Sequence, residues 1–132
     1  MINLQYDWKL VMDGINKMDK LLKLATKIAK QLTDNQYKMV AILTDRKGKI
    51  LSIGTNSYSK THTEQARYAK LAGQDARVYL HAEIDAITKC RGKAHTIYVV
   101  RVNNAGQTRP AKPCPICAGA IKEIGIKNIL YT

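Results

Sequence analysis

The sequence predicts an α/β fold in which one mixed β-sheet carries helices on both of its faces. The hydrophobic periodicity changes along the chain in the order helix, strand, strand, helix, helix, strand, helix, strand, and this alternation is typical of helices that pack on both sides of a sheet. The segment TIYVVRV at 96–102 is apolar at nearly every position, as expected for a strand that is buried on both faces. An amphipathic segment at 7–32 precedes the first strand, so we expect a long N-terminal helix.

The N-terminal helix is predicted over residues 7–32. Its apolar residues recur at spacings of three and four, which places them on one helical face. Lysines fill the other positions, namely Lys17, Lys20, Lys23, Lys27 and Lys30. A basic helical face can contact nucleic acid, but it is more often the solvated side of a helix that packs on a core. We favour the second interpretation for this helix.

The next predicted elements are a β-hairpin and a short helix. Residues 37–43 and 50–53 are predicted strands, and the polar turn between them contains Gly48, which can adopt a positive φ angle. Residues 54–61 are polar and predict a loop. A helix over 63–71 follows, and Gly73 ends it.

The rest of the chain predicts two more helices and two more strands. One helix begins near His81, and the other runs from Cys114 or Pro115 to Glu123. The buried strand at 96–102 lies between these helices and is followed by a polar loop over 103–112. Residues 128–131 (NILY) form the last predicted strand.

Length and composition indicate a single domain, residues 1–132, with an ordinary apolar content. No apolar run approaches the roughly 20 residues that span a bilayer, and the N-terminus lacks the basic flank and apolar stretch of a signal peptide. We therefore expect a soluble, cytoplasmic protein with no membrane partner. The formal net charge of +12 attracts anions such as nucleotides or nucleic acid but does not choose among them.

Two short motifs carry the chemical signal. They are His-Ala-Glu at 81–83 and Pro-Cys-Pro-Ile-Cys at 113–117, and each lies at the predicted start of a helix. Cys114 and Cys117 are three positions apart, so they share a helical face and can hold one metal ion. His81 can add an imidazole nitrogen. The odd number of cysteines and the absence of a secretion signal argue against a disulfide framework.

These residues predict a catalytic zinc site. Three protein ligands leave one position of a tetrahedral Zn2+ for water, whereas a structural site normally adds a fourth protein ligand. Glu83 is two residues from His81, where its carboxylate can take a proton from that water. A CxxC pair alone could be redox-active or structural. Together, HxE and PCxxC form the signature of zinc-dependent base deaminases, so we favour a hydrolase.

The stretch from 37 to 131 resembles the cytidine deaminase-like superfamily. GTN at 54–56, LHAEIDAI at 80–87 and PCPICAGAI at 113–121 are similar to its three signatures. The resemblance implies a three-layer α/β/α cytidine deaminase-like fold with a mixed sheet, here with a long N-terminal helix and a shortened C-terminus. It also implies Zn2+ as the cofactor and assigns the site residues. His81, Cys114 and Cys117 would bind the metal, and Glu83 would be the catalytic proton shuttle.

The resemblance also implies substrate contacts and an assembly. Asn56 would hold the sugar or the base, the backbone of Ala82 would meet the base carbonyl, and the carbonyl of Lys112 would lie near the leaving amine. Domains of this superfamily usually complete their pockets across subunit interfaces. We therefore expect a homo-oligomer.

Two branches of the superfamily resemble this sequence, and they imply different substrates. The segment GTNSY is similar to the GYNG motif of deoxycytidylate deaminases, with Ser57 in place of the second glycine, while PCxxCAGAI is also found in tRNA adenosine deaminases. Both branches usually continue past the last strand, whereas this sequence stops at Thr132. We expect a free cytosine nucleotide such as dCMP, whose phosphate would be held by basic residues of two loops, namely Lys60, Arg109 and Lys112.

Two alternatives stay open. The first is a deaminase that acts on cytosine or adenine in single-stranded DNA or RNA, which the positive charge favours. The second, more remote, is a catalytically inactive, zinc-stabilised module that binds nucleic acid. Glu83 argues against the second alternative, because a purely structural metal site has no need of a carboxylate at that position.

Overall fold

The computed structural model describes residues 8–32, 37–74 and 79–132, with side chains from Lys20 onward. The helices in this part of the chain are α1 (Trp8–Gln31), α2 (Thr63–Leu71), α3 (Ala82–Lys89) and α4 (Pro115–Glu123). The strands are β1 (Lys38–Thr44), β2 (Ile50–Thr55), β3 (Thr96–Val102), β4 (Thr108–Arg109) and β5 (Asn128–Tyr131). All the predicted elements are present in the predicted order, and β4 is added to them.

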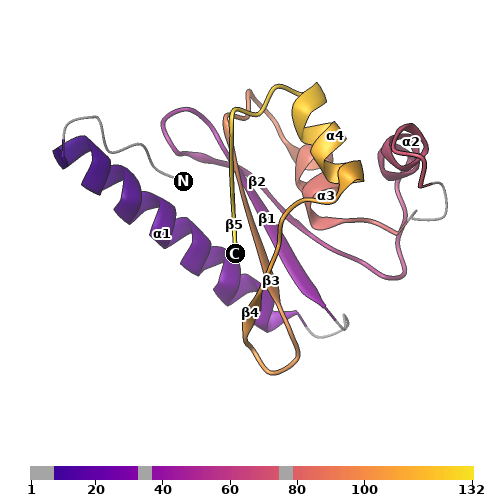
Figure 1. Ribbon diagram of the computed structural model, residues 1–132, viewed down its shortest axis with the longest axis horizontal. Coiled ribbons are helices and arrows are strands. Elements are labelled where there is room, and N and C mark those ends of the chain that lie inside the picture. Colours follow the sequence, from indigo (N-terminus) through magenta and orange to yellow (C-terminus); the bar gives the residue numbers. More distant parts are fainter. Residues whose placement is uncertain (1–7, 33–36, 75–78) are drawn as a thin grey trace.

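The sheet is mixed and has β1 and β3 at its centre. β1 is antiparallel to both β2 and β3, whereas β5 is parallel to β3. β4 and β5 share the edge of β3 that faces away from β1, because β4 pairs with Arg101 and Val102 and β5 pairs with residues 96–99. The predicted mixed sheet is confirmed (Figure 1).

α1 covers one face of this sheet (Figure 1). Its buried residues, spaced by four, are Leu21, Ala25 and Ala29. They pack against alternate residues of the two central strands, which are Val40, Ile42, Tyr98, Val100 and Val102. The described lysines of α1 are exposed, as predicted for the solvated side of a core helix; they are Lys20, Lys23, Lys27 and Lys30. The side chain of Lys17 lies outside the described part.

α3 and α4 cover the opposite face of the sheet, and α2 lies beyond them (Figure 1). Residues of β1 and β3 that point away from α1 form a second core with both helices; this core includes Ala41, Leu43, Ala86, Ile97, Val99 and Ile121. α2 packs against α3 and α4 through Tyr68 and Ala69. The predicted three-layer α/β/α fold is therefore confirmed. No helix among the described residues is long and apolar enough to cross a membrane.

The structure differs from the predicted elements at two places. β2 continues through Gly54 and Thr55, which were predicted to lie in a loop, because these residues pair with Ala41 and Val40 of β1. Glycine is usual in a strand where another backbone approaches closely, and α3 approaches Gly54 in this way. β4 lies within the predicted loop at 103–112, since a strand of two residues is too short to show a hydrophobic period.

Gly54→Ala is expected to lower the free energy of unfolding by about 2 kcal/mol or more, because an added Cβ would overlap the carbonyl oxygen of Ala82 and the amide nitrogen of Ala86. Gly119→Ala is the matched control. Gly119 lies in α4 with no atom within 4 Å of an added Cβ, so this change should be neutral or stabilise by about 0.5–1 kcal/mol. Urea unfolding measures both variants, and equal stabilities would contradict the close approach of α3 to β2.

Candidate metal centre and active site

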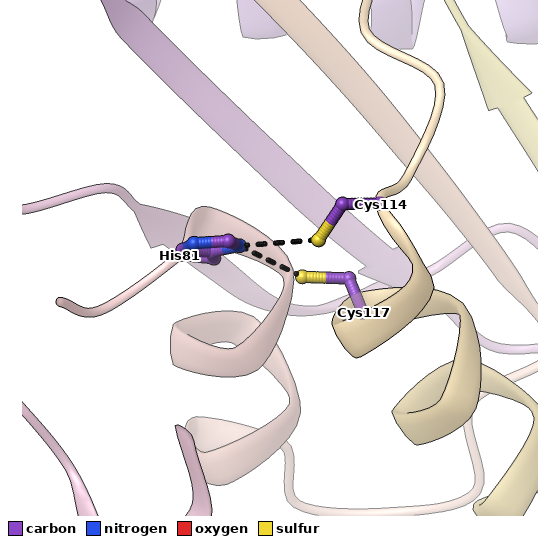
Figure 2. Close-up of side chains that lie close together, drawn as sticks. All are labelled: His81, Cys114 and Cys117. Carbon is purple, nitrogen blue, oxygen red and sulfur yellow. Dashed lines mark hydrogen bonds between the residues drawn. The ribbon is translucent and has the colours of Figure 1, made fainter. Parts of the chain in front are cut away.

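The three side chains that are predicted to bind the metal meet where α3 and α4 begin. His81 is the N-cap residue of α3 and Cys114 is the N-cap residue of α4, both with extended backbone. Cys117 lies one turn further into α4. Figure 2 shows the imidazole of His81 facing both cysteine sulfurs from the neighbouring helix. The predicted positions of both motifs at helix starts are confirmed.

The distances in this cluster fit a tetrahedral metal ion. The Nδ1 atom of His81 is 3.3 Å from the Sγ atom of Cys117 and 3.5 Å from the Sγ atom of Cys114. All three ligand atoms lie within 4.8 Å of one another. Ligand atoms around a tetrahedral Zn2+ are separated by about 3.6–3.8 Å, given the usual Zn–N and Zn–S bond lengths. The donor set and its spacing therefore suit zinc.

The start of α4 also provides the right electrostatic setting for thiolate ligands. Pro115 occupies a first-turn position where its missing N–H group removes no helical hydrogen bond, and the positive end of the helix dipole favours negative sulfur. A hydrogen bond from Cys117 lowers the pKa of the Cys114 thiol to about 4 against the effect of burial, with a further contribution from His81. The same hydrogen bond, together with burial, raises the pKa of Cys117.

Glu83 is buried beside the cluster and carries an unsatisfied oxygen. It lies in the first turn of α3 with 2% of its surface exposed. Its Oε1 atom has no hydrogen-bond partner among the described residues. Burial raises the pKa of this carboxyl group, while the nearby charge of His81 lowers it in part. A buried acceptor without a partner is unfavourable unless a water or a ligand completes it, so the position suits a group that acts on a bound water.

Two polar residues that the sequence analysis missed support the site. Gln65 of α2 is fully buried, and its Oε1 atom accepts a hydrogen bond of 3.0 Å from the backbone N–H of His81. Asp85 of α3 accepts hydrogen bonds from the backbone N–H of Thr55 at 3.0 Å and from Lys89 at 2.9 Å. Gln65 lies three and four positions before the buried Tyr68 and Ala69, so the helical spacing indicates that it is buried. The spacing does not indicate its hydrogen bond to His81.

The structure brings some of the predicted substrate residues together and leaves others apart. Asn56 and Lys60 line one cavity of about 360 Å3, together with Leu80, which directly precedes His81. The side chain of Asn56 accepts a hydrogen bond from the backbone N–H of Met39 and donates one to the carbonyl of Tyr37, both at 2.9 Å. It therefore ties the end of β2 to the start of β1, and its contact with substrate stays a prediction.

The remaining predicted substrate residues lie near the cluster in sequence but not at that cavity. Ala82 is fully buried as the first residue of α3. Lys112 is exposed, two residues before Cys114, and Arg109 is exposed in β4. Neither Arg109 nor Lys112 is among the described residues that line the cavity with Asn56. Their roles in holding a phosphate stay predictions.

The comparison with known families identifies the class of protein. Residues 15–132 match the family model described as "Cytidine and deoxycytidylate deaminase zinc-binding region", and the chain belongs to this family. A search of the curated proteins gives no match. The family match and the cluster of one histidine and two cysteines agree on Zn2+ as the cofactor of a zinc-dependent deaminase.

Gln65→Met is expected to weaken Zn2+ binding by about tenfold, because it keeps the length of the side chain but removes the acceptor that orients the backbone of His81. Gln65→Glu keeps an acceptor oxygen and should retain more of the affinity. Competition with a chromophoric zinc chelator measures this without any turnover. Gln31→Met, the same change at an exposed position of α1, is the control. An affinity that is unchanged in Gln65→Met would show that Gln65 does not position the ligand.

Proposed function

We propose that this protein hydrolyses the amino group from a free cytosine nucleotide, converting a dCMP-like substrate into a dUMP-like product and ammonia. The observation that carries the hydrolytic part of this proposal is the buried Glu83 oxygen without a partner among the described residues, next to three residues whose donor atoms fit Zn2+. A structural metal site gives no reason to bury a carboxylate in this way, because the burial is unfavourable for folding. Hydrolytic catalysis gives a reason for this burial, since the carboxylate must face the water that reacts.

In the proposed reaction Glu83 carries the protons. His81, Cys114 and Cys117 would hold the Zn2+, which would lower the pKa of a bound water toward neutrality. The Glu83 carboxylate takes one proton from the attacking water and returns it to the ring nitrogen beside the amino-bearing carbon. The second proton of that water passes through Glu83 to the amine, which leaves as ammonia while the new carbonyl forms. One water enters and one ammonia leaves. Burial raises the pKa of Glu83, which suits a group that both accepts and donates a proton.

The start of α3 and the cavity that Asn56 and Lys60 line support a small nucleotide substrate, although the described lining of that cavity includes Leu80 and not the cluster residues themselves. The N–H group of Ala82 lies in the first turn of α3, where a helix leaves its donors unpaired, so it can meet the base carbonyl. Lys60 lines the cavity next to Asn56 and offers one charge for one terminal phosphate. The proposed homo-oligomer is supported by exposed apolar residues near the end of α4 and in β5, namely Ile124, Ile129 and Tyr131.

A single-stranded nucleic acid is the second candidate substrate, and two observations favour it. The net charge of +12 would attract a polyanion. Tyr58 and Tyr79 expose 45% and 53% of their surface on either side of Lys60 in the chain, and Thr61 pairs with Tyr79 in an isolated β-bridge. Exposed aromatic rings can stack on bases next to the reacting one.

Glu83→Gln is expected to reduce turnover by about 100-fold or more while Zn2+ content and thermal stability stay close to those of the unaltered protein. The amide has the same size as the carboxylate but cannot take and return a proton. Ammonia release and metal analysis of the same preparation test this. Parallel loss of zinc and activity would mean that Glu83 serves the metal site rather than the proton transfer.

The substrate class is tested by comparing kcat/KM for dCMP, CMP, deoxycytidine and a cytosine-containing single strand at two salt concentrations. We expect dCMP to be preferred, with a modest dependence on salt, because one phosphate is neutralised. Lys60→Ala should raise KM for dCMP about tenfold and leave deoxycytidine unchanged. A strand preferred over dCMP, with a steep dependence on salt, would favour the second candidate and reject the first.

A further inference from the structure

A second cavity lies at the opposite end of α3 and α4 from the metal cluster. It has a volume of about 510 Å3 and is lined by three loops: the β1–β2 turn at 45–47, the α3–β3 connection at 93–95 and the α4–β5 connection around 125–127. α3 begins at the cluster and runs for 8 residues, or about 12 Å, toward this cavity. The cavity is therefore separate from the site of deamination.

The lining of this cavity is strongly basic. Arg46, Lys47, Lys93 and Lys127 come from all three loops, and His95 lies among them. The one carboxylate in the lining, Asp45, accepts hydrogen bonds of 2.9 Å from the backbone N–H groups of Lys47 and Lys49, so it stabilises its own turn. In the part of the chain that the structure describes, no carboxylate forms an ion pair with Arg46, Lys93 or Lys127.

Helix dipoles account for only part of this concentration of charge. Lysines near the C-terminal ends of helices are commonly stabilised by the negative end of the dipole, which would explain Lys93 and Lys127. The end of α4, however, already has backbone partners, because the N–H groups of Gly125 and Ile126 bond to carbonyls of its last turns. Arg46 and Lys47 belong to a hairpin turn and not to a helix end. Arg46, Lys93 and Lys127 are exposed, and an anion bound among these cations would reduce their mutual repulsion.

The three loops are held in fixed positions relative to one another. The backbone N–H of His95 bonds to the carbonyl of Thr44 at the end of β1, at 2.8 Å. The carbonyl of His95 in turn accepts bonds from the N–H groups of Lys127 and Asn128, at 2.9 and 3.1 Å. The cavity is thus formed before any ligand arrives, which reduces the entropy that binding would lose.

We propose that this cavity binds an oligophosphate, meaning two or three neighbouring phosphate groups. Its volume lies within the range of about 300–1,000 Å3 that is usual for small-ligand sites. The guanidinium of Arg46 can hold one phosphate through two parallel hydrogen bonds, while the lysines act as point charges around it. Such groups occur in free oligophosphates and as consecutive phosphates of a nucleic-acid strand. Both sources would be bound through the same phosphate contacts, and titration with each of them distinguishes the two.

The test is isothermal titration of the zinc-loaded full chain with inorganic tripolyphosphate. Lys93→Gln combined with Lys127→Gln should weaken binding about tenfold or more. Lys20→Gln combined with Lys27→Gln removes the same charge from the exposed face of α1 and should change the affinity less than twofold. Both variants are expected to melt at the temperature of the unaltered protein. No binding at millimolar tripolyphosphate, or equal weakening in the two variants, would overturn the proposal.

A second titration, with a single strand of twelve thymidines, distinguishes the two sources. A strand whose affinity falls in the cavity variant, and which tripolyphosphate displaces, identifies nucleic acid as a source of the phosphates. If the cavity variant loses tripolyphosphate binding but keeps its affinity for the single strand, the cavity is assigned to free oligophosphates. Deamination by the cavity variant should stay unchanged in either case, because its substitutions lie outside the catalytic site. Loss of turnover in a folded cavity variant would contradict the separation of the two sites.

Discussion

The close packing of α3 against β2 determines where the metal site can form. Gly54 has no side chain, so the helix backbone lies directly against the strand. Two hydrogen bonds also join β2 to α3. Ser52 Oγ donates to the carbonyl of Ala86 at 2.7 Å, and the N–H of Thr55 donates to the carboxylate of Asp85 at 3.0 Å. Together these contacts hold the first turn of α3 in place. His81 and Glu83 belong to that turn, so their positions depend on a strand that contributes no ligand.

The second helix completes the site from the other side. α4 begins next to α3 (Figures 1 and 2) and presents both cysteine sulfurs to the same ring nitrogen of His81. Two positive helix ends therefore converge on one point, where they favour thiolates and a carboxylate over their neutral forms. Burial acts on Glu83 in the opposite direction and raises its pKa. The site thus combines an electrostatic preference for anions with a desolvation that keeps Glu83 able to hold a proton.

Most of the fold and the metal ligands could be predicted from local sequence patterns. The spacing of Cys114 and Cys117 and the position of Pro115 identify the start of α4, and TIYVVRV identifies the buried centre of the sheet. Contacts between distant segments could not be predicted in this way. Nothing in the local sequence around Gln65 indicates its hydrogen bond to His81. The sequence predicts a loop at Gly54, because a glycine that makes room for a packed helix has the same local pattern as a glycine that forms a turn. The basic residues at 46 and 93 share a cavity only once the chain has folded.

The order of the ligands along the chain links metal binding to folding. β3 lies between His81 and the cysteines, and its central position is set by pairing with β1, more than fifty residues earlier in the chain. Before that long-range pairing forms, the two cysteines alone can bind a metal ion, and only weakly compared with the complete set. Zn2+ therefore binds the native chain in preference to the unfolded one, and by mass action the concentration of free zinc contributes to the stability of the whole sheet. The affinity of the chain for Zn2+ therefore depends on whether the β-sheet has assembled.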